Sequence, residues 1–219
     1  MLKWVGALFG ALFIAAFAFI STRPDTYRIE RSATVDAPCE LVFGLVNDFE
    51  NWPEWSPWQD LDPEQSQTYS GAEAGAGAIT EWSGNEDVGK GRMEITESVD
   101  NERIGIDLAF IEPFESKART RFDFVPNGTT TRVSWTMEGR SDIVMKAMSL
   151  VMDMDATVGA DFEKGLARLD RLAQAEAKRR QEAAQAAAVA SAEAAQEAEK
   201  AQEEAETGSD APEASVETP

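Results

Sequence analysis

Apolar and polar residues alternate along the middle of the chain, and turn residues recur every ten or so positions. The alternation is clearest over residues 103–111, 116–125 and 129–138. Successive side chains of a strand point to opposite faces of the sheet, so each of these strands has one apolar and one charged face. This pattern predicts an antiparallel sheet with one face in water. Further strands are expected at residues 27–35, 67–69, 78–83 and 89–98, which makes about seven in all.

The spacing of apolar residues becomes helical toward the end of the folded part. Val158, Phe162 and Leu166 follow one another at steps of four, and charged residues occupy the other faces. Such a one-sided helix needs an apolar partner. The preceding residues 143–154 hold four methionines, a residue type that fills irregular cores or lines cavities. We therefore expect one long helix over residues 142–173 to cover the apolar face of the sheet, and a shorter helix at residues 38–48.

The first 22 residues form a separate apolar segment. Residues 4–20 carry no charge and would span about 26 Å as a helix, close to the thickness of a bilayer core. The segment is read either as a retained transmembrane anchor or as a secretory signal cleaved after Ala16-Phe17-Ala18. Gly6 and Gly10 form a GxxxG pair, which predicts at most weak self-association.

Residues 174–219 form an acidic tail rich in Ala, Glu and Gln. These residues favour a helix but leave almost nothing to bury, so the last helix is expected to continue for some turns and then fray. Residues 208–219 have the composition of a disordered segment. The predicted organisation is therefore an apolar segment at 1–22, a globular domain at 26–173 and a tail at 174–219.

Composition excludes several classes of chemistry. The formal net charge of −20 disfavours a nucleic-acid partner, because an acidic surface repels phosphate. The chain has one cysteine, Cys39, and no histidine, so it can form no internal disulfide, no Cys/His zinc site and no histidine-based nucleophilic triad. No metal, cofactor or catalytic residue is predicted.

Five segments together resemble the START-like (SRPBCC) superfamily, and within it bacterial proteins of the polyketide cyclase/dehydrase-like group. The segments are residues 30–38, 51–58, 89–98, 131–139 and 161–166. The resemblance covers about residues 26–172 and implies an α+β helix-grip fold, in which a curved antiparallel sheet wraps a long C-terminal helix. It also implies a cavity for hydrophobic ligands between the two. It supplies no catalytic motif, because members include carriers, binders and a few cyclases.

The residues expected to line that cavity follow from the strand and helix patterns. Glu97 and Thr120 are the expected polar contacts, since each shares phase with apolar neighbours on its strand. The tryptophan-rich segment at 51–58 is read either as the lip of the cavity or as the closed end of the core. The full set of candidates is Trp55, Trp58, Trp82, Met93, Ile95, Glu97, Ile106, Leu108, Phe110, Thr120, Phe122, Phe124, Val133, Trp135, Met137, Met148, Met152 and Phe162.

Three functions remain open from the sequence. The first is binding or transport of a hydrophobic small molecule or lipid by a domain tethered to the membrane through residues 4–20. The second is a cyclase or dehydratase in which Glu97 moves protons inside the cavity. The third is an interaction module that presents the tail or the tryptophans to a partner at the membrane. The expected location is the bacterial inner membrane, single-pass with the domain in the periplasm, or secretion after signal cleavage.

Overall fold

The computed structural model describes residue 14, residues 17–150 and residues 152–208. The chain divides into two units, of which the first ends at Ala175 and the second begins at Glu176. The first unit holds the sheet and the helices packed on it. The second holds the later part of the last helix.

The first unit is built on one seven-stranded antiparallel sheet, with the strand order β1-β7-β6-β5-β4-β3-β2. Turn residues join neighbouring strands in chain order from β2 to β7, and β1 pairs with β7 along its whole length. The alternation of apolar and polar residues predicted these strands. Their bounds are Thr26–Val35 for β1, Ser66–Gly71 for β2, Ala78–Ser83 for β3, Lys90–Val99 for β4, Arg103–Glu112 for β5, Ser116–Asn127 for β6 and Thr130–Arg140 for β7.

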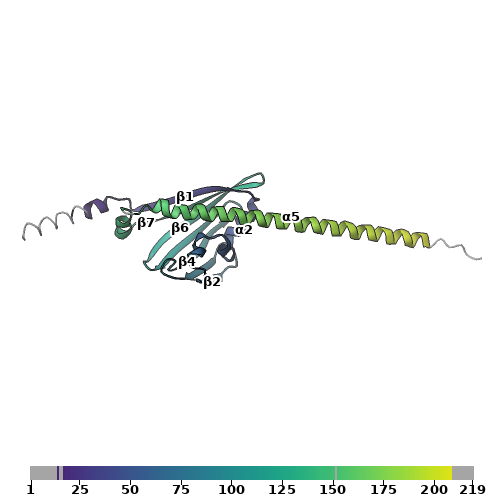
Figure 1. The fold of residues 1–219 in the computed structure, drawn as a ribbon, viewed down its shortest axis with the longest axis horizontal. Helices are drawn as coiled ribbons and strands as arrows, with labels where there is room; N and C mark the ends of the chain where they lie inside the picture. Colours follow the sequence, from purple (N-terminus) through teal and green to yellow (C-terminus); the bar gives the residue numbers. More distant parts are fainter. Residues whose placement is uncertain (1–13, 15–16, 151, 209–219) are drawn as a thin grey trace, which may run out of the picture. The chain divides into compact units, whose positions relative to one another are not determined.

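Helical segments connect the strands and cover one face of the sheet (Figure 1). The connection from β1 to β2 contains α2 (Cys39–Asn47), η1 (Phe49–Asn51), α3 (Trp52–Trp55) and η2 (Pro57–Asp60). The helices α4 (Ile143–Met148) and α5 (Met154–Gly208) follow β7. On α5, Phe162, Leu166 and Leu169 are almost completely buried. The predicted helix-grip α+β fold is therefore confirmed.

The expectation of one continuous helix over residues 142–173 is wrong in its first half, because two helices begin there instead. The Asp142 side chain accepts a hydrogen bond from the Met145 N–H at 2.8 Å and caps α4. The Asp153 side chain accepts one from the Ala156 N–H at 3.1 Å at the start of α5. A carboxylate in this position satisfies N–H groups that have no partner within the helix, so each aspartate favours a new helix start.

The second unit continues α5 as helix to Gly208, further than the predicted fraying. Glu176 accepts a hydrogen bond from the Arg180 guanidinium at 2.8 Å, and Lys178 lies 3.8 Å from Glu182. Such pairs one turn apart support an exposed helix by a few tenths of a kcal/mol each. Residues 209–219 of the predicted disordered segment lie outside the described residues.

The predicted apolar segment at residues 4–20 lies mostly outside the described residues, as do Gly6 and Gly10. Its described members include Ile14, Phe17 and Phe19, whose side chains are exposed. Within the part of the chain that the structure describes, no helix combines the length and the apolar character needed to cross a membrane.

Candidate functional site

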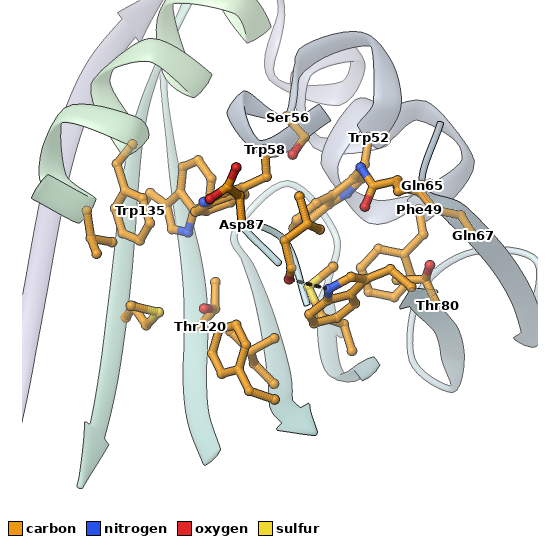
Figure 2. Close-up of a pocket in the computed structure, with 18 residues that line it drawn as sticks. Phe49, Trp52, Ser56, Trp58, Gln65, Gln67, Thr80, Asp87, Thr120 and Trp135 are labelled. Carbon is orange, nitrogen blue, oxygen red and sulfur yellow. Dashed lines mark hydrogen bonds between the residues drawn. The ribbon is translucent and has the colours of Figure 1, made fainter. Parts of the chain in front are cut away.

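A cavity of about 230 Å³ lies between the apolar face of the sheet, the start of α5 and the segment that carries the tryptophans. Figure 2 shows the side chains that line it. Most of them are apolar or aromatic. They are Phe49, Trp52, Ser56, Trp58, Gln65, Gln67, Thr80, Trp82, Asp87, Val88, Met93, Leu108, Phe110, Thr120, Trp135, Met137, Val158 and Phe162.

The strands form the floor of the cavity with residues that stand directly opposite one another. Thr80 pairs with Met93, Met93 with Leu108, and Thr120 with Met137. Residues paired across an antiparallel ladder point to the same face of the sheet, so the register brings these side chains together. Five strands from β3 to β7 thus contribute to one surface.

The tryptophan segment closes one side of the cavity and also belongs to the core. Trp55 is fully buried, and the Trp52 indole N–H donates to the Val46 carbonyl at 2.9 Å. Trp58 is half-buried and lines the cavity, where its ring packs edge-on against Trp135 and Phe162. Both readings of this segment therefore apply, to different tryptophans.

Aromatic stacking joins α5 to the sheet beside the cavity. The rings of Trp135 on β7 and Phe162 on α5 are parallel within 5°, with centroids 4.1 Å apart. Aromatic pairs of this kind contribute about 0.5–1.5 kcal/mol beyond the area they bury. The pair fixes the separation between helix and sheet at this point of the fold.

Trp82 covers the floor of the cavity because its cross-strand partner is a glycine. Gly91 pairs with Trp82, and a Cβ atom at Gly91 would lie 2.2 Å from the indole ring. The indole N–H donates to the Val88 carbonyl at 3.3 Å, which is the dashed line in Figure 2. The missing side chain of Gly91 thus allows the ring to lie against the strand.

Polar groups in the cavity are few. Thr80 and Thr120 are buried among the apolar side chains of the floor. Gln65 and Gln67 each donate a hydrogen bond to the Gln59 side chain, at 3.0 and 3.3 Å. Asp87 is the one ionisable side chain among the described residues that line the cavity, and it is exposed. The lining therefore combines a large apolar surface with a few polar groups, as ligand pockets commonly do.

The structure brings half of the predicted candidates to the cavity. Trp58, Trp82, Met93, Leu108, Phe110, Thr120, Trp135, Met137 and Phe162 line it. Six further candidates are buried in the core but are not among the lining residues, namely Trp55, Ile95, Ile106, Phe122, Phe124 and Val133. That any of these residues contacts a ligand stays a prediction.

Glu97 lies on the outer face of the sheet, contrary to expectation. A β-bulge between Ile95 and Glu97 inserts Thr96 as an extra residue, so that Glu97 pairs with Gly105 instead of continuing the phase of Ile95. The Glu97 carboxylate is 2.9 Å from the Arg103 guanidinium and 3.7 Å from that of Arg119. Glu97 therefore cannot act as a general acid or base inside the cavity.

The prediction that Met148 and Met152 line the cavity is also wrong. Their side chains are 42% and 47% exposed, and neither lines the cavity. The break between α4 and α5 removes them from the face that continues into Phe162. The expectation failed because an apolar run gives no sign of where a helix is interrupted.

Several lining residues were missed by the sequence reading, and two of them carried a usable signal. Thr80 is two residues from Trp82 and shares its face of β3, and Val158 is one helical turn before Phe162. Gln65, Gln67, Asp87 and Val88 come from turns or short strands without a clear period. Their positions follow from the tertiary fold and not from local pattern.

The remaining reactive groups offer little chemistry. Burial raises the pKa of the Cys39 thiol, which favours the protonated and unreactive form. The thiol lies 3.3 Å from the Asn101 carbonyl and outside the cavity lining. No group of three or more His, Cys, Asp or Glu side chains suited to a metal ion occurs within the described residues.

One comparison with known proteins shows the family of the chain. A family model described as polyketide cyclase/dehydrase and lipid transport matches residues 26–174. No curated protein matches the chain. Similar solved structures include a protein from Chromobacterium violaceum (19% identity, TM-score 0.49, covering 69% of this chain and 98% of that one) and one from Thermus thermophilus (19%, 0.48, 68% and 99%). The Aha1 dimer from Colwellia psychrerythraea is another (14%, 0.47, 66% and 93%).

Proposed function

Because the chain belongs to the polyketide cyclase/dehydrase and lipid transport family, we propose that it binds a hydrophobic small molecule or lipid in the cavity beneath α5. The family membership confirms the resemblance seen in the sequence motifs. The observation that carries the proposal is the cavity itself, an unfilled space lined by apolar side chains of five strands and α5. Burying an apolar ligand there would remove this surface from water.

The volume of the cavity limits the size of the ligand. An engineered protein cavity of about 150 Å³ accommodates benzene, so about 230 Å³ suits a somewhat larger molecule, such as a fused bicyclic ring or part of an acyl chain. A longer lipid would extend through the opening beside Asp87. Thr80 and Thr120 offer hydroxyl groups to a carbonyl or hydroxyl of the ligand.

The site supports binding better than catalysis. General acid–base catalysis needs a titrating group within hydrogen-bonding distance of the substrate. Glu97, the residue expected to serve, faces away from the cavity, and Asp87 stands exposed at its opening. We therefore infer a binder or carrier and not a cyclase.

We further propose that residues 4–20 tether the domain to the bacterial inner membrane, with the domain in the periplasm. The support is the run of seventeen uncharged residues ahead of β1. Alkaline carbonate extraction of cell membranes should leave the full-length chain in the pellet, and protease added to spheroplasts should digest the domain. A soluble product that begins after Ala18 would instead identify a cleaved signal.

Ligand binding is tested on the purified full chain in detergent, by native mass spectrometry and by solvent extraction of co-purified lipids. Val158→Trp places an indole in the cavity from α5, and we expect it to reduce the bound ligand at least tenfold. Ala156→Trp is the matched control, since Ala156 lies on the exposed face of the same helical turn. Equal ligand content in the two variants would contradict the assignment of the cavity as the binding site.

A further inference from the structure

Exposed apolar side chains are concentrated in a few segments of the first unit. Ten of the fifteen large apolar residues that are exposed in the described part lie in the N-terminal segment, in the end of β5 and the β5–β6 turn, or in α4 and the residues after it. We name the last two segments together the apolar end, defined by Ile111, Phe114, Ile143, Val144, Met148, Leu150 and Met152. Phe114 is 73% exposed. Exposed apolar side chains that gather at one end of a domain point to an interaction site.

The strand register places these segments at the same end of the sheet. Thr26 at the start of β1 pairs with Arg140 at the end of β7, directly before α4. The β5–β6 turn lies between Phe110 and Ser116, which pair with each other at the same end. In Figure 1, α4 and the described N-terminal residues lie beside this end of the strands. The β6–β7 turn lies at the other end.

The chain itself indicates what faces the apolar end. The uncharged residues 4–20 are followed closely by β1, and only five residues separate Ile20 from Thr26. Even fully extended, the six Cα–Cα steps from Ile20 to Thr26 reach about 20 Å. A bilayer that holds residues 4–20 must therefore lie within about 20 Å of the first residue of β1, on the side of the domain where the apolar end is exposed.

The exposed side chain of the described cavity lining, that of Asp87, also lies at this end. Asp87 and Val88 belong to the β3–β4 turn, and Val158 belongs to the first turns of α5. The β3–β4 and β5–β6 turns touch, since the Lys90 ammonium lies 2.8 Å from the Glu112 carboxylate and a Cβ atom at Gly89 would meet the Glu112 carbonyl at 2.2 Å. The exposed part of the lining is thus adjacent to the β5–β6 turn, which carries the exposed Phe114.

Charge at the apolar end favours an apolar contact over an electrostatic one. Lys90 is paired with Glu112, and Lys146 is buried and paired with Asp25. The exposed cations Lys117 and Arg140 are accompanied by Glu115 and Asp142. Without an excess of positive charge, this surface gains little from anionic headgroups.

We propose that the apolar end docks on the lipid bilayer, with Phe114 and α4 inserted at the level of the headgroups and upper acyl chains, so that the cavity opens onto the membrane surface. The proposal rests on the proposed ligand cavity and tether, and it adds the orientation of the domain and the route by which a ligand enters. Shallow insertion of exposed apolar side chains is the usual mode of interfacial binding.

Membrane depth measured by spin-label EPR tests the docking. The full chain is reconstituted in phosphatidylcholine vesicles with Cys39→Ser as background, and single labels are introduced by Phe114→Cys, Val144→Cys or Val125→Cys. Val125 is the matched control, because it is 57% exposed and lies about 30 Å further along β6. We expect labels at 114 and 144 to favour collision with oxygen over a water-soluble nickel chelate, and the label at 125 to show the reverse.

Three outcomes would overturn the docking. Labels at 114 and 144 that meet the nickel chelate as readily as the label at 125 place the apolar end in water. Labels shielded from both reagents show that protein covers the surface, either the N-terminal residues or a second copy of the chain. If the full chain does not bind the vesicles at all, the apolar end does not dock on a bilayer. None of these outcomes changes the ligand content measured for Val158→Trp, so docking and ligand binding fail separately.

Discussion

The surface where α5 meets the sheet differs between the two parts of the helix. Beyond Phe162, the apolar residues Leu166 and Leu169 are almost completely buried. Before it, Val158 is half-buried and faces the cavity. One amphipathic helix on one sheet therefore gives a packed region and a hollow region on either side of a single stacked aromatic pair.

The difference shows that the arrangement of large side chains, and not the pattern of the helix, decides where the fold leaves space. In the packed region, Trp52 and Trp55 lie within 4.7 Å of each other, centroid to centroid, and both pack against Phe122 and Trp135. Toward the β3–β4 turn, Trp82 packs edge-on against Phe110, and no ring contact within the described residues joins this pair to Phe162 on α5. The gap that remains is the cavity.

The largest expected effect is the difference in unfolding free energy between two truncated side chains on α5. Leu169→Ala should cost about 2–5 kcal/mol of unfolding free energy, because it leaves a void in a filled core. Val158→Ala should cost at most about 1 kcal/mol, since Val158 already borders empty space and alanine is the better helix former. Urea denaturation of both variants, followed by tryptophan fluorescence, gives the two values. Equal losses would mean that the region around Val158 is packed as well.

A smaller effect is expected from filling the floor of the hollow region. Gly91→Ala brings a methyl group against the Trp82 ring and within 2.7 Å of the Ala109 carbonyl, which should cost about 1–3 kcal/mol. Gly44→Ala on α2 is the control, because a Cβ atom there meets nothing within 4 Å. The control should be neutral or stabilised by up to about 1 kcal/mol. Thermal unfolding measures both, and a tolerated Gly91→Ala would show that Trp82 is free to move.

The smallest effect concerns an ion pair that ties η2 to the packed part of α5. The Arg168 guanidinium and the Lys164 ammonium lower the pKa of Asp60 from 3.8 to about 2. The unfolded chain therefore binds a proton at Asp60 before the folded chain does, so this contribution to stability is present above pH 3.8 and is lost as the pH falls through about 2. Because the pair is exposed, water screens it and the effect on stability is slight.

The titration of Asp60 is followed directly by the carboxyl ¹³C chemical shift in the folded chain. Asp60→Asn is the control for stability, and its loss relative to the unaltered chain should shrink as the pH is lowered below 3.8. An Asp60 carboxyl that titrates at the value usual for exposed aspartate would show that η2 is not held to α5 by these charges.

The sequence predicted the long strands and the covering helix because their patterns are regular over many residues. The alternation of β5, β6 and β7 and the helical stripe from Val158 to Leu169 follow from local geometry alone. The bulge at Thr96 could not be predicted in this way. Alternation continues through Glu97 in the sequence, and only pairing with Gly105 reveals the extra residue.

The candidate site was predictable in part for a related reason. Periodicity identifies the face of a strand, so Met93, Leu108 and Met137 were expected to face inward, and the structure places them there. Periodicity does not predict which inward-facing side chains pack against other side chains and which border the cavity. Ile106 and Leu108 have the same phase on β5, yet Ile106 is core and Leu108 lines the cavity.

The interruption between α4 and α5 separates two mechanical attachments. Lys146 and the backbone of Ser141 fasten α4 to Asp25, whereas Asp155 and Glu163 fasten α5 to Arg31 on β1. Because the helix is interrupted, a displacement of α4 is not transmitted directly to the start of α5, which covers the cavity. Substitutions can therefore change the contacts of α4 without changing the shape of the cavity. Substitutions in the cavity can likewise leave the contacts of α4 intact, so the two features can evolve independently.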